Sequence, residues 1–196
     1  MASRTKTSFS LGAGLILTLS AVGIGAFLGS DPVSADPPAM QTPDQIKADM
    51  LLNIARYVEW PSGVFVQSNS PVMLGVYGKT RLMDELKIQG KEKRVNGREI
   101  LVRQFFWPAP PNCNVLYISE TEKPRVAWIL RKVQYSSVLT VSELEDFTSH
   151  GGMVRFVLQD QKVRFHINMA AATNAQLKVS SRLLNVADSV KWGPEK

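Results

Sequence analysis

The chain has 196 residues, of which 44% are hydrophobic and 20% are charged, a balance typical of a folded globular protein. Its formal net charge is +6, but no run of five like charges marks a nucleic-acid-binding tail, so we expect no nucleic-acid partner. Two histidines, His150 and His166, and a single cysteine, Cys113, exclude a Cys/His zinc cluster and an intrachain disulfide. The sequence therefore predicts a domain that uses no metal and no cofactor.

The first 35 residues are predicted to be an export signal. Residues 1–10 carry Arg4 and Lys6 and no acid, and residues 11–28 are uncharged and mostly apolar. Pro32-Val33-Ser34-Ala35 then places small residues three and one before a cleavage site after Ala35. The alternative is an uncleaved anchor, because the apolar stretch is nearly long enough to span a bilayer, although its glycines argue against this.

A short loop, 36–41, is expected to precede one domain over 42–196. This domain has no second apolar run long enough to cross a membrane, so we expect no stable membrane insertion after cleavage. Its first helix is predicted to begin with a capping box, Thr42 with Gln45, and to end at Trp60-Pro61, because proline disfavours helical geometry in the residue before it.

Further elements are predicted from apolar runs bounded by glycine and proline. The predicted buried strands are 72–77, 99–105, 115–119 and 138–141, and the predicted helices are 81–88, a helix opened by Pro124 and ending near Val133, and a single turn over 142–147. Pro108, Pro110 and Pro111 form a loop that neither a helix interior nor a strand interior would accept.

A hairpin is predicted near the C-terminus. Residues 153–158 and 163–167 alternate apolar and polar side chains, so they are expected to pair antiparallel with one face toward solvent. Asn168 is expected to cap the next helix. Beyond it we prefer a short helix, an extended segment over 177–179 and a last helix capped by Ser180 to a single long helix.

These elements define a fold class. Strands that alternate with helices favour parallel pairing, and the late hairpin adds an antiparallel pair at one end of the sheet. We therefore expect an α/β fold, a three-layer sandwich with a mixed, mainly parallel sheet and a C-terminal antiparallel hairpin.

No motif of a known catalytic site is present. The Gly-x-Ser-x-Gly nucleophile elbow and the glycine-rich P-loop are both absent. Cys113 precedes an apolar strand, where a small buried residue explains it better than a nucleophile does. Glu143, Glu145 and Asp146 stand at a predicted helix start, which favours capping over acid/base chemistry. We predict that the protein is not an enzyme.

Several segments form a pattern whose order and spacing are together specific. They are Val58-Glu59-Trp60-Pro61, Leu74-Gly75-Val76-Tyr77-Gly78, Gly97-Arg98, Cys113-Asn114-Val115-Leu116-Tyr117-Ile118-Ser119, Leu139-Thr140-Val141-Ser142, Phe147 before Gly151-Gly152-Met153, Val163-Arg164-Phe165-His166-Ile167-Asn168 and Leu177-Lys178-Val179-Ser180-Ser181-Arg182-Leu183-Leu184. With these segments the domain resembles, over almost its whole length, the YfiR-like family of small periplasmic proteins, formerly a domain of unknown function.

The resemblance implies a non-enzymatic, inhibitory role in the periplasm. The best-understood type in the family is a repressor that binds the sensor domain of a membrane-bound diguanylate cyclase. Relief of that binding raises cyclic di-GMP in the cytoplasm and favours biofilm. We therefore expect this protein to bind and repress the periplasmic domain of an inner-membrane sensor or diguanylate cyclase in signal transduction, and the resemblance is also compatible with a homodimer.

Two departures from the family pattern limit what is carried over. Members with a redox role resemble disulfide proteins, whereas this chain has one cysteine, so control by an intrachain disulfide is not available to it. His166 stands where an acidic residue is expected in the strand motif, so the partner contacts there are expected to differ.

A second class of function is a periplasmic small-ligand binding protein or receptor accessory. The carboxyl ends of parallel strands commonly form a ligand crevice, which favours this alternative. The neighbouring genes discriminate between the two. A membrane diguanylate cyclase or other sensor favours the regulator, and a transporter or outer-membrane receptor favours the ligand-binding protein.

The partner contact is expected around the Gly151-Gly152 turn, the hairpin and the segment that follows it, where the family match is densest. The candidate residues recur at spacing two in two consecutive segments: Arg164, His166 and Asn168, then Lys178, Ser180 and Arg182. A solvated sheet surface would show the same alternation. Because arginine is favoured at interface hot spots, Arg164 and Arg182 are the strongest single candidates.

Export with processing predicts a mature protein that begins at Asp36. Mass spectrometry of the exported protein measures this N-terminus directly. A protein that still begins at residue 1 or 2 would contradict cleavage and support the anchor.

Overall fold

The computed structural model describes residues 41–160 and 162–193. The predicted signal peptide, its cleavage site and residues 36–40 of the predicted loop lie outside these residues. The helices are α1 (Pro43–Arg56), α2 (Leu82–Glu92), the 3₁₀ helix η1 (Glu120–Arg125), α3 (Val126–Val133), α4 (Met169–Asn174) and α5 (Ser181–Val186). The strands are β1 (Val58–Glu59), β2 (Val72–Tyr77), β3 (Ile100–Phe105), β4 (Val115–Ile118), β5 (Leu139–Ser142), β6 (Val154–Gln159), β7 (Lys162–Asn168), β8 (Lys178–Val179) and β9 (Ser189–Lys191).

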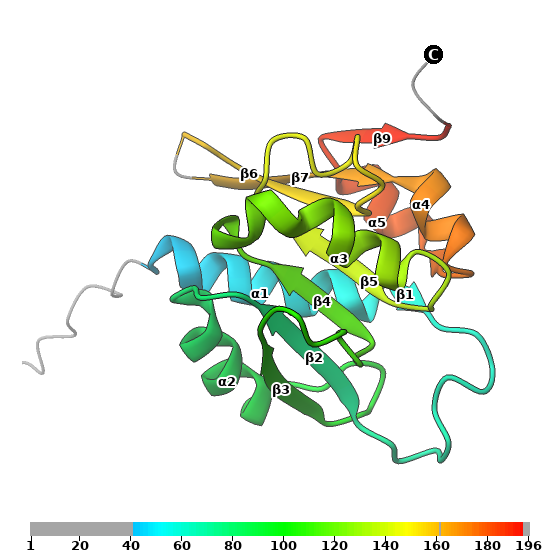
Figure 1. Cartoon of the computed structure of the whole chain (residues 1–196). Coiled ribbons are helices and arrows are strands. Elements are labelled where there is room, and N and C mark those ends of the chain that lie inside the picture. The colour runs from blue at the N-terminus through cyan, green and yellow to red at the C-terminus, as the bar shows by residue number, and fades with distance from the viewer. Residues whose placement is uncertain (1–40, 161, 194–196) are drawn as a thin grey trace, which may run out of the picture. The chain divides into compact units, whose positions relative to one another are not determined.

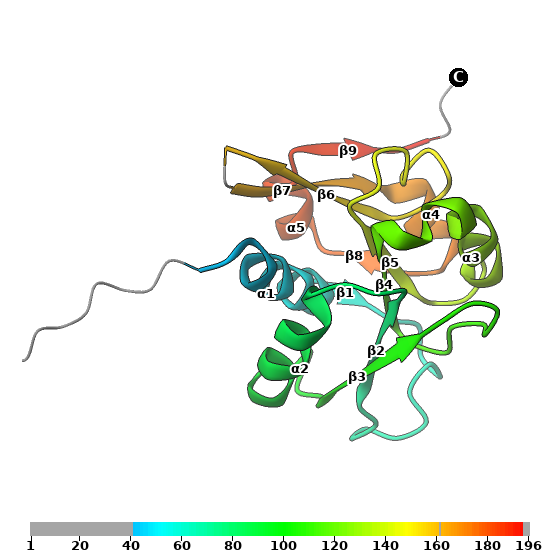
Figure 2. The ribbon, with the colours of Figure 1, turned by 60° about the vertical axis from the view of Figure 1, so that its left-hand side comes forward.

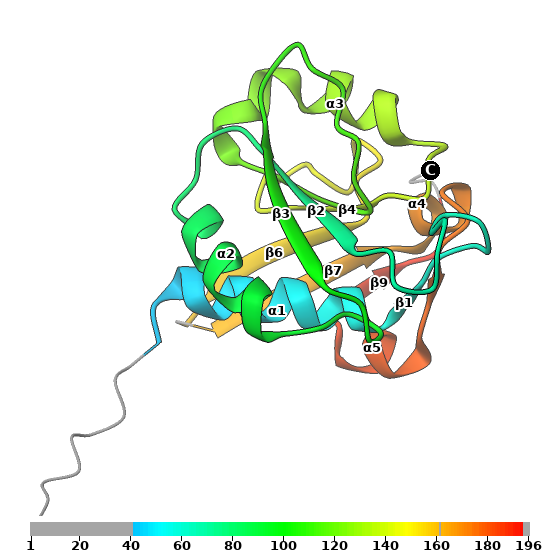
Figure 3. The same ribbon diagram turned by 90° about the horizontal axis from the view of Figure 1, so that it is seen from below.

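Seven strands form one sheet in the order β3-β2-β4-β5-β6-β7-β9, and β1 pairs with β8 in a separate two-stranded sheet (Figures 1 and 2). Within the large sheet only β6 and β7 are antiparallel, and the other five pairings are parallel. Helix α3 lies on one side of the sheet, and α1, α2 and α5 lie on the other (Figure 3). The predicted three-layer α/β sandwich with a mainly parallel sheet and an antiparallel hairpin is confirmed.

The larger hydrophobic core lies between the sheet and α1. Leu51, Leu52 and Ile54 of this helix are at most 1% exposed, and they share one cluster with alternate residues of the strands, from Leu74 in β2 to Phe165 in β7. Helix α2 adds Leu82, Met83 and Leu86 to the same cluster, and α5 adds Leu183. This face is therefore covered from β3 to the hairpin.

The smaller core lies under α3, which contributes Val126, Ile129, Leu130 and Val133. Its sheet residues come from β2, β3 and β4, with further contacts from the loops around Val138, Leu144 and Phe147. No residue of β6, β7 or β9 belongs to it among the buried residues of the described chain. On this side the cover ends at the middle of the sheet.

The predicted capping box at Thr42 is confirmed, because its hydroxyl accepts from the N–H of Gln45, whose side chain accepts from the N–H of Thr42. The predicted end at Trp60-Pro61 is wrong. The helix ends at Arg56, because Val58 and Glu59 turn extended and pair with Val179 and Lys178 of β8. A partner strand more than 100 residues away along the chain overrides the local helical pattern.

Three other helix predictions differ from the structure. Helix α2 extends a turn beyond residue 88, since Gly90 packs closely against Ile100 and Val102 of β3. Pro124 lies inside η1 and α3 begins only at Val126. The helical turn predicted over 142–147 does not form: Ser142 still belongs to β5, its hydroxyl accepts from the N–H of Leu144, and a non-helical turn follows from residue 145.

The predicted hairpin, the Asn168 cap and the preferred arrangement after it are confirmed. Asn168 Oδ1 accepts from the N–H of Ala171 at the start of α4, and Ser180 accepts from the N–H of Arg182 at the start of α5, with β8 between the two helices.

Cys113 is 8% exposed, and burial raises the pKa of its thiol to about 12, so the thiolate is unpopulated at neutral pH.

In the Gly151-Gly152 turn, the second glycine leaves no room for a side chain. A Cβ on Gly152 would lie 2.3 Å from the ring of Phe147, which is fully buried. We expect Gly152→Ala to lower the free energy of unfolding by about 1–3 kcal/mol through overpacking. Urea denaturation measures this, with Gly193→Ala as the control because nothing lies within 4 Å of a Cβ there. Equal stability of the two variants would contradict this packing.

Candidate partner-binding surface

Beyond α3, one side of β6, β7 and β9 is left without a helix over it. In β7 the side chains alternate strictly: Val163, Phe165 and Ile167 enter the larger core, whereas Arg164 and His166 point to the opposite side. The registers place further side chains on the same side. We call this surface the hairpin face, and it comprises Arg155, Val157, Lys162, Arg164, His166, Ser189 and Lys191.

Arg164 and His166 are tied to the β9 end of the hairpin face. Arg164 Nη1 donates to Asp188 Oδ1 at 2.8 Å, and His166 Nδ1 bonds to the hydroxyl of Ser189. The second Asp188 oxygen lies 3.9 Å from His166 Nε2. These contacts hold both side chains at fixed positions on a surface that is partly exposed to solvent.

The charge of the hairpin face is mainly positive. Arg155, Lys162, Arg164 and Lys191 lie on it, and Asp188 at its margin pairs with Arg164. Arg155 stands directly opposite His166 across the β6–β7 pair, and its Nε is buried without a hydrogen-bond partner among the described residues. A surface of this kind suits an acidic partner, because oppositely charged patches accelerate encounter and fix orientation.

Asn168, the third predicted contact of this strand, is 6% exposed. Its amide donates to the carbonyl of Thr148 at 2.9 Å while its Oδ1 caps α4. Its side chain therefore joins the turn before the hairpin to the helix after it, and it supports the end of the hairpin face from within.

Lys178, Ser180 and Arg182 are not brought together with Arg164 and His166. Lys178 belongs to the two-stranded sheet with β1, and the Ser180 N–H donates to the carbonyl of Tyr57 after α1. Arg182 is in α5, whose Leu183 packs into the same core as Phe165. The second predicted group therefore lies on the α1 side of the sheet, and the six residues form two separate patches.

Sequence reasoning missed Arg155, Asp188 and Ser189. The alternation of β6 could have indicated Arg155, because antiparallel pairing puts it beside His166. Nothing local indicated Asp188 or Ser189, because their place depends on the parallel pairing of β9 with β7.

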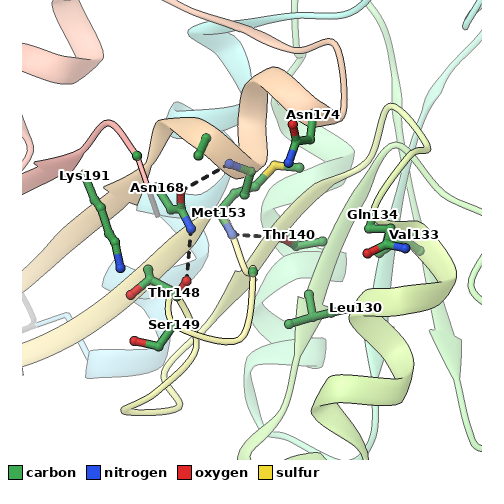
Figure 4. Close-up of a pocket in the computed structure, with 14 residues that line it drawn as sticks. Leu130, Val133, Gln134, Thr140, Thr148, Ser149, Met153, Asn168, Asn174 and Lys191 are labelled. Atoms are coloured by element: carbon green, nitrogen blue, oxygen red, sulfur yellow. Dashed lines mark hydrogen bonds between the residues drawn. The ribbon is translucent and has the colours of Figure 1, made fainter. Parts of the chain in front are cut away.

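A cavity of 560 Å³ lies at the end of the hairpin face, between α3, the turn at Thr148–Gly151 and α4. Asn168, Thr148, Ser149 and Lys191 line one wall, and Leu130 and Val133 line the other (Figure 4). In the part of the chain that the structure describes, no three metal-ligating side chains converge. The cavity mixes apolar residues with uncharged polar ones, since Gln134 and Thr140 also line it, and such a lining suits recognition of a ligand.

Residues 44–188 match the YfiR/HmsC-like family. The chain belongs to this family. The family is one of non-catalytic, periplasmic regulators of cyclic di-GMP signalling. No helix in residues 41–160 and 162–193 is long and apolar enough to cross a membrane.

The fold is also similar to that of a solved structure, a conserved domain protein from Vibrio cholerae O1 biovar El Tor strain N16961. The TM-score is 0.55 at 12% sequence identity, with 76% of this chain covered. The chain spans 60% of that protein's length. The likeness supports the fold of this family member.

Proposed function

We propose that this protein binds the periplasmic sensor domain of a membrane-bound diguanylate cyclase through the hairpin face and represses it. The open, cationic side of the hairpin is the observation that carries this proposal. A seven-stranded sheet in a three-layer fold is ordinarily covered on both faces, and here the adjacent strands β6 and β7 contribute to the hydrophobic core on one face only. Docking of a partner domain would complete the missing layer.

The contacts of Arg164 support its role as an anchor. Its side chain is 47% exposed, which leaves guanidinium donors for a carboxylate of the partner beside the bond to Asp188. His166, held by Ser189, would lie next to it within the contact. Because both side chains are already positioned in the free protein, binding would cost little side-chain entropy.

Lys178, Ser180 and Arg182 form the second patch of the proposal. Lys178 and Arg182 are exposed, but the Ser180 hydroxyl is used as a helix cap. We expect this patch to make secondary contacts at most, because it lies in the other layer of the fold.

A second candidate function is small-ligand binding, which the 560 Å³ cavity favours. Its volume is within the range of small-molecule sites, about 300–1,000 Å³. Since Lys191 and Asn168 line it at the end of the hairpin face, a ligand bound there would lie beside the proposed partner contact.

The proposal predicts a strong effect of Arg164→Glu on binding. Charge reversal should weaken binding of the neighbouring gene's sensor domain by about tenfold or more, whereas Arg182→Glu should weaken it by less than about threefold. Pull-down with titrated sensor domain measures both, and thermal melts establish that each variant is folded.

Arg131→Glu on α3 is the matched control, because it makes the same charge change at an exposed position away from the hairpin face. It should bind as the wild type does. Wild-type affinity of folded Arg164→Glu together with lost binding of Arg182→Glu would place the contact on the α1 side of the sheet.

A further inference from the structure

A second crevice lies outside the carboxyl ends of β2 and β4, two neighbouring strands in the interior of the sheet. From β2 the chain crosses over through α2 to β3 on one side, and from β4 it crosses through α3 to β5 on the other. The two crossover helices lie on opposite faces of the sheet (Figure 3). The β2/β4 boundary is therefore the topological switch point, where open α/β sheets commonly bind ligands.

The two loops that leave these strands are fastened to each other. The Ser119 hydroxyl donates to the carbonyl of Lys79 at 2.6 Å, and the Lys79 N–H donates to Thr121 Oγ1 at 3.3 Å. Gly78 has a φ of +87°, and a Cβ there would lie 2.7 Å from Thr121 and from Glu122. The loops therefore have a defined separation, and they enclose a cavity of 270 Å³.

The floor of this crevice is a closed set of polar contacts. The buried Tyr117 hydroxyl donates to Glu143 Oε1 at 2.5 Å, and Lys47 Nζ lies 2.7 Å from the other oxygen of that carboxylate. Asp44 lies 3.7 Å from the same Lys47. Lys47 of α1 and Glu143, which follows β5, therefore neutralise each other in an ion pair.

The rim is different, because two cations there have no ion-pair partner. Lys79 and Arg81 both line the cavity and are exposed, and neither forms an ion pair with any residue of the described chain, although Glu120 also lines the cavity. An arginine fork and a lysine ammonium that line one cavity are suited to an oxyanion, the first as a bidentate donor and the second as a point charge.

We propose that this crevice binds a small anionic ligand through a carboxylate or phosphate group held by Lys79 and Arg81. The small volume restricts the ligand to a compact molecule. Ser119 and Thr121 keep the Lys79 loop in place, so the site is formed before the ligand arrives. The site shares no residue with the hairpin face, so it stands independently of the proposed function.

Isothermal titration of the full exported protein with inorganic phosphate and, separately, with succinate tests the proposal and separates the two ligand classes. We expect saturable binding of at least one, weakened by about tenfold in the double variant Lys79→Ala/Arg81→Ala. The control is Lys87→Ala/Lys91→Ala, which removes two exposed charges from α2 outside the crevice. It should bind as the wild type does.

Amide chemical-shift mapping on the wild-type protein gives a second readout that does not depend on any variant. Shifts should concentrate at residues 78–81 and 119–121. No saturable binding of either anion, an equal loss in the control variant, or shifts centred on another surface would each overturn the proposal.

Discussion

The partial cover of one sheet face is the constraint on which the proposed contact surface depends. Neighbouring strands are about 4.8 Å apart and a helix is about 10 Å wide, so one helix covers roughly two to three strands. Helix α3 is the only helix packed on its side of the described sheet, and its core reaches β2, β3 and β4. The hairpin and β9 therefore carry mainly polar side chains on that side, with Arg155, Arg164 and His166 in the hairpin and Ser189 and Lys191 in β9, although Val157 also lies there.

The opposite face of the sheet, on the α1 side, is covered by helices and therefore requires apolar side chains. There α1, α2 and α5 cover the sheet from β3 to the hairpin, so the inward residues of β7, such as Phe165 and Ile167, are apolar. Because apolar and polar side chains alternate along β7, the strand places apolar residues in the core and polar residues on the hairpin face. This alternation also explains why the hairpin could be recognised before its neighbours were known, since the period of two is a property of the strand itself.

What could not be recognised depends on pairings between distant segments. The short strand after α1 forms because Val58 meets Val179, and the two predicted contact groups are divided between layers because β8 pairs with β1 rather than with β7. Spacing within Lys178, Ser180 and Arg182 carries no information on which sheet receives them. The capping residues Thr42, Asn168 and Ser180 were predictable, since a cap requires only the residues next to it.

The hairpin face is the proposed surface through which the protein binds its partner. Hydrogen–deuterium exchange of the protein with and without the sensor domain of the neighbouring gene tests this most directly. The account predicts added protection of backbone amides in β6, β7 and β9, with α3 and residues 178–182 little changed. Protection confined to α3 or to the β1–β8 sheet, with β7 and β9 unaffected, would contradict it.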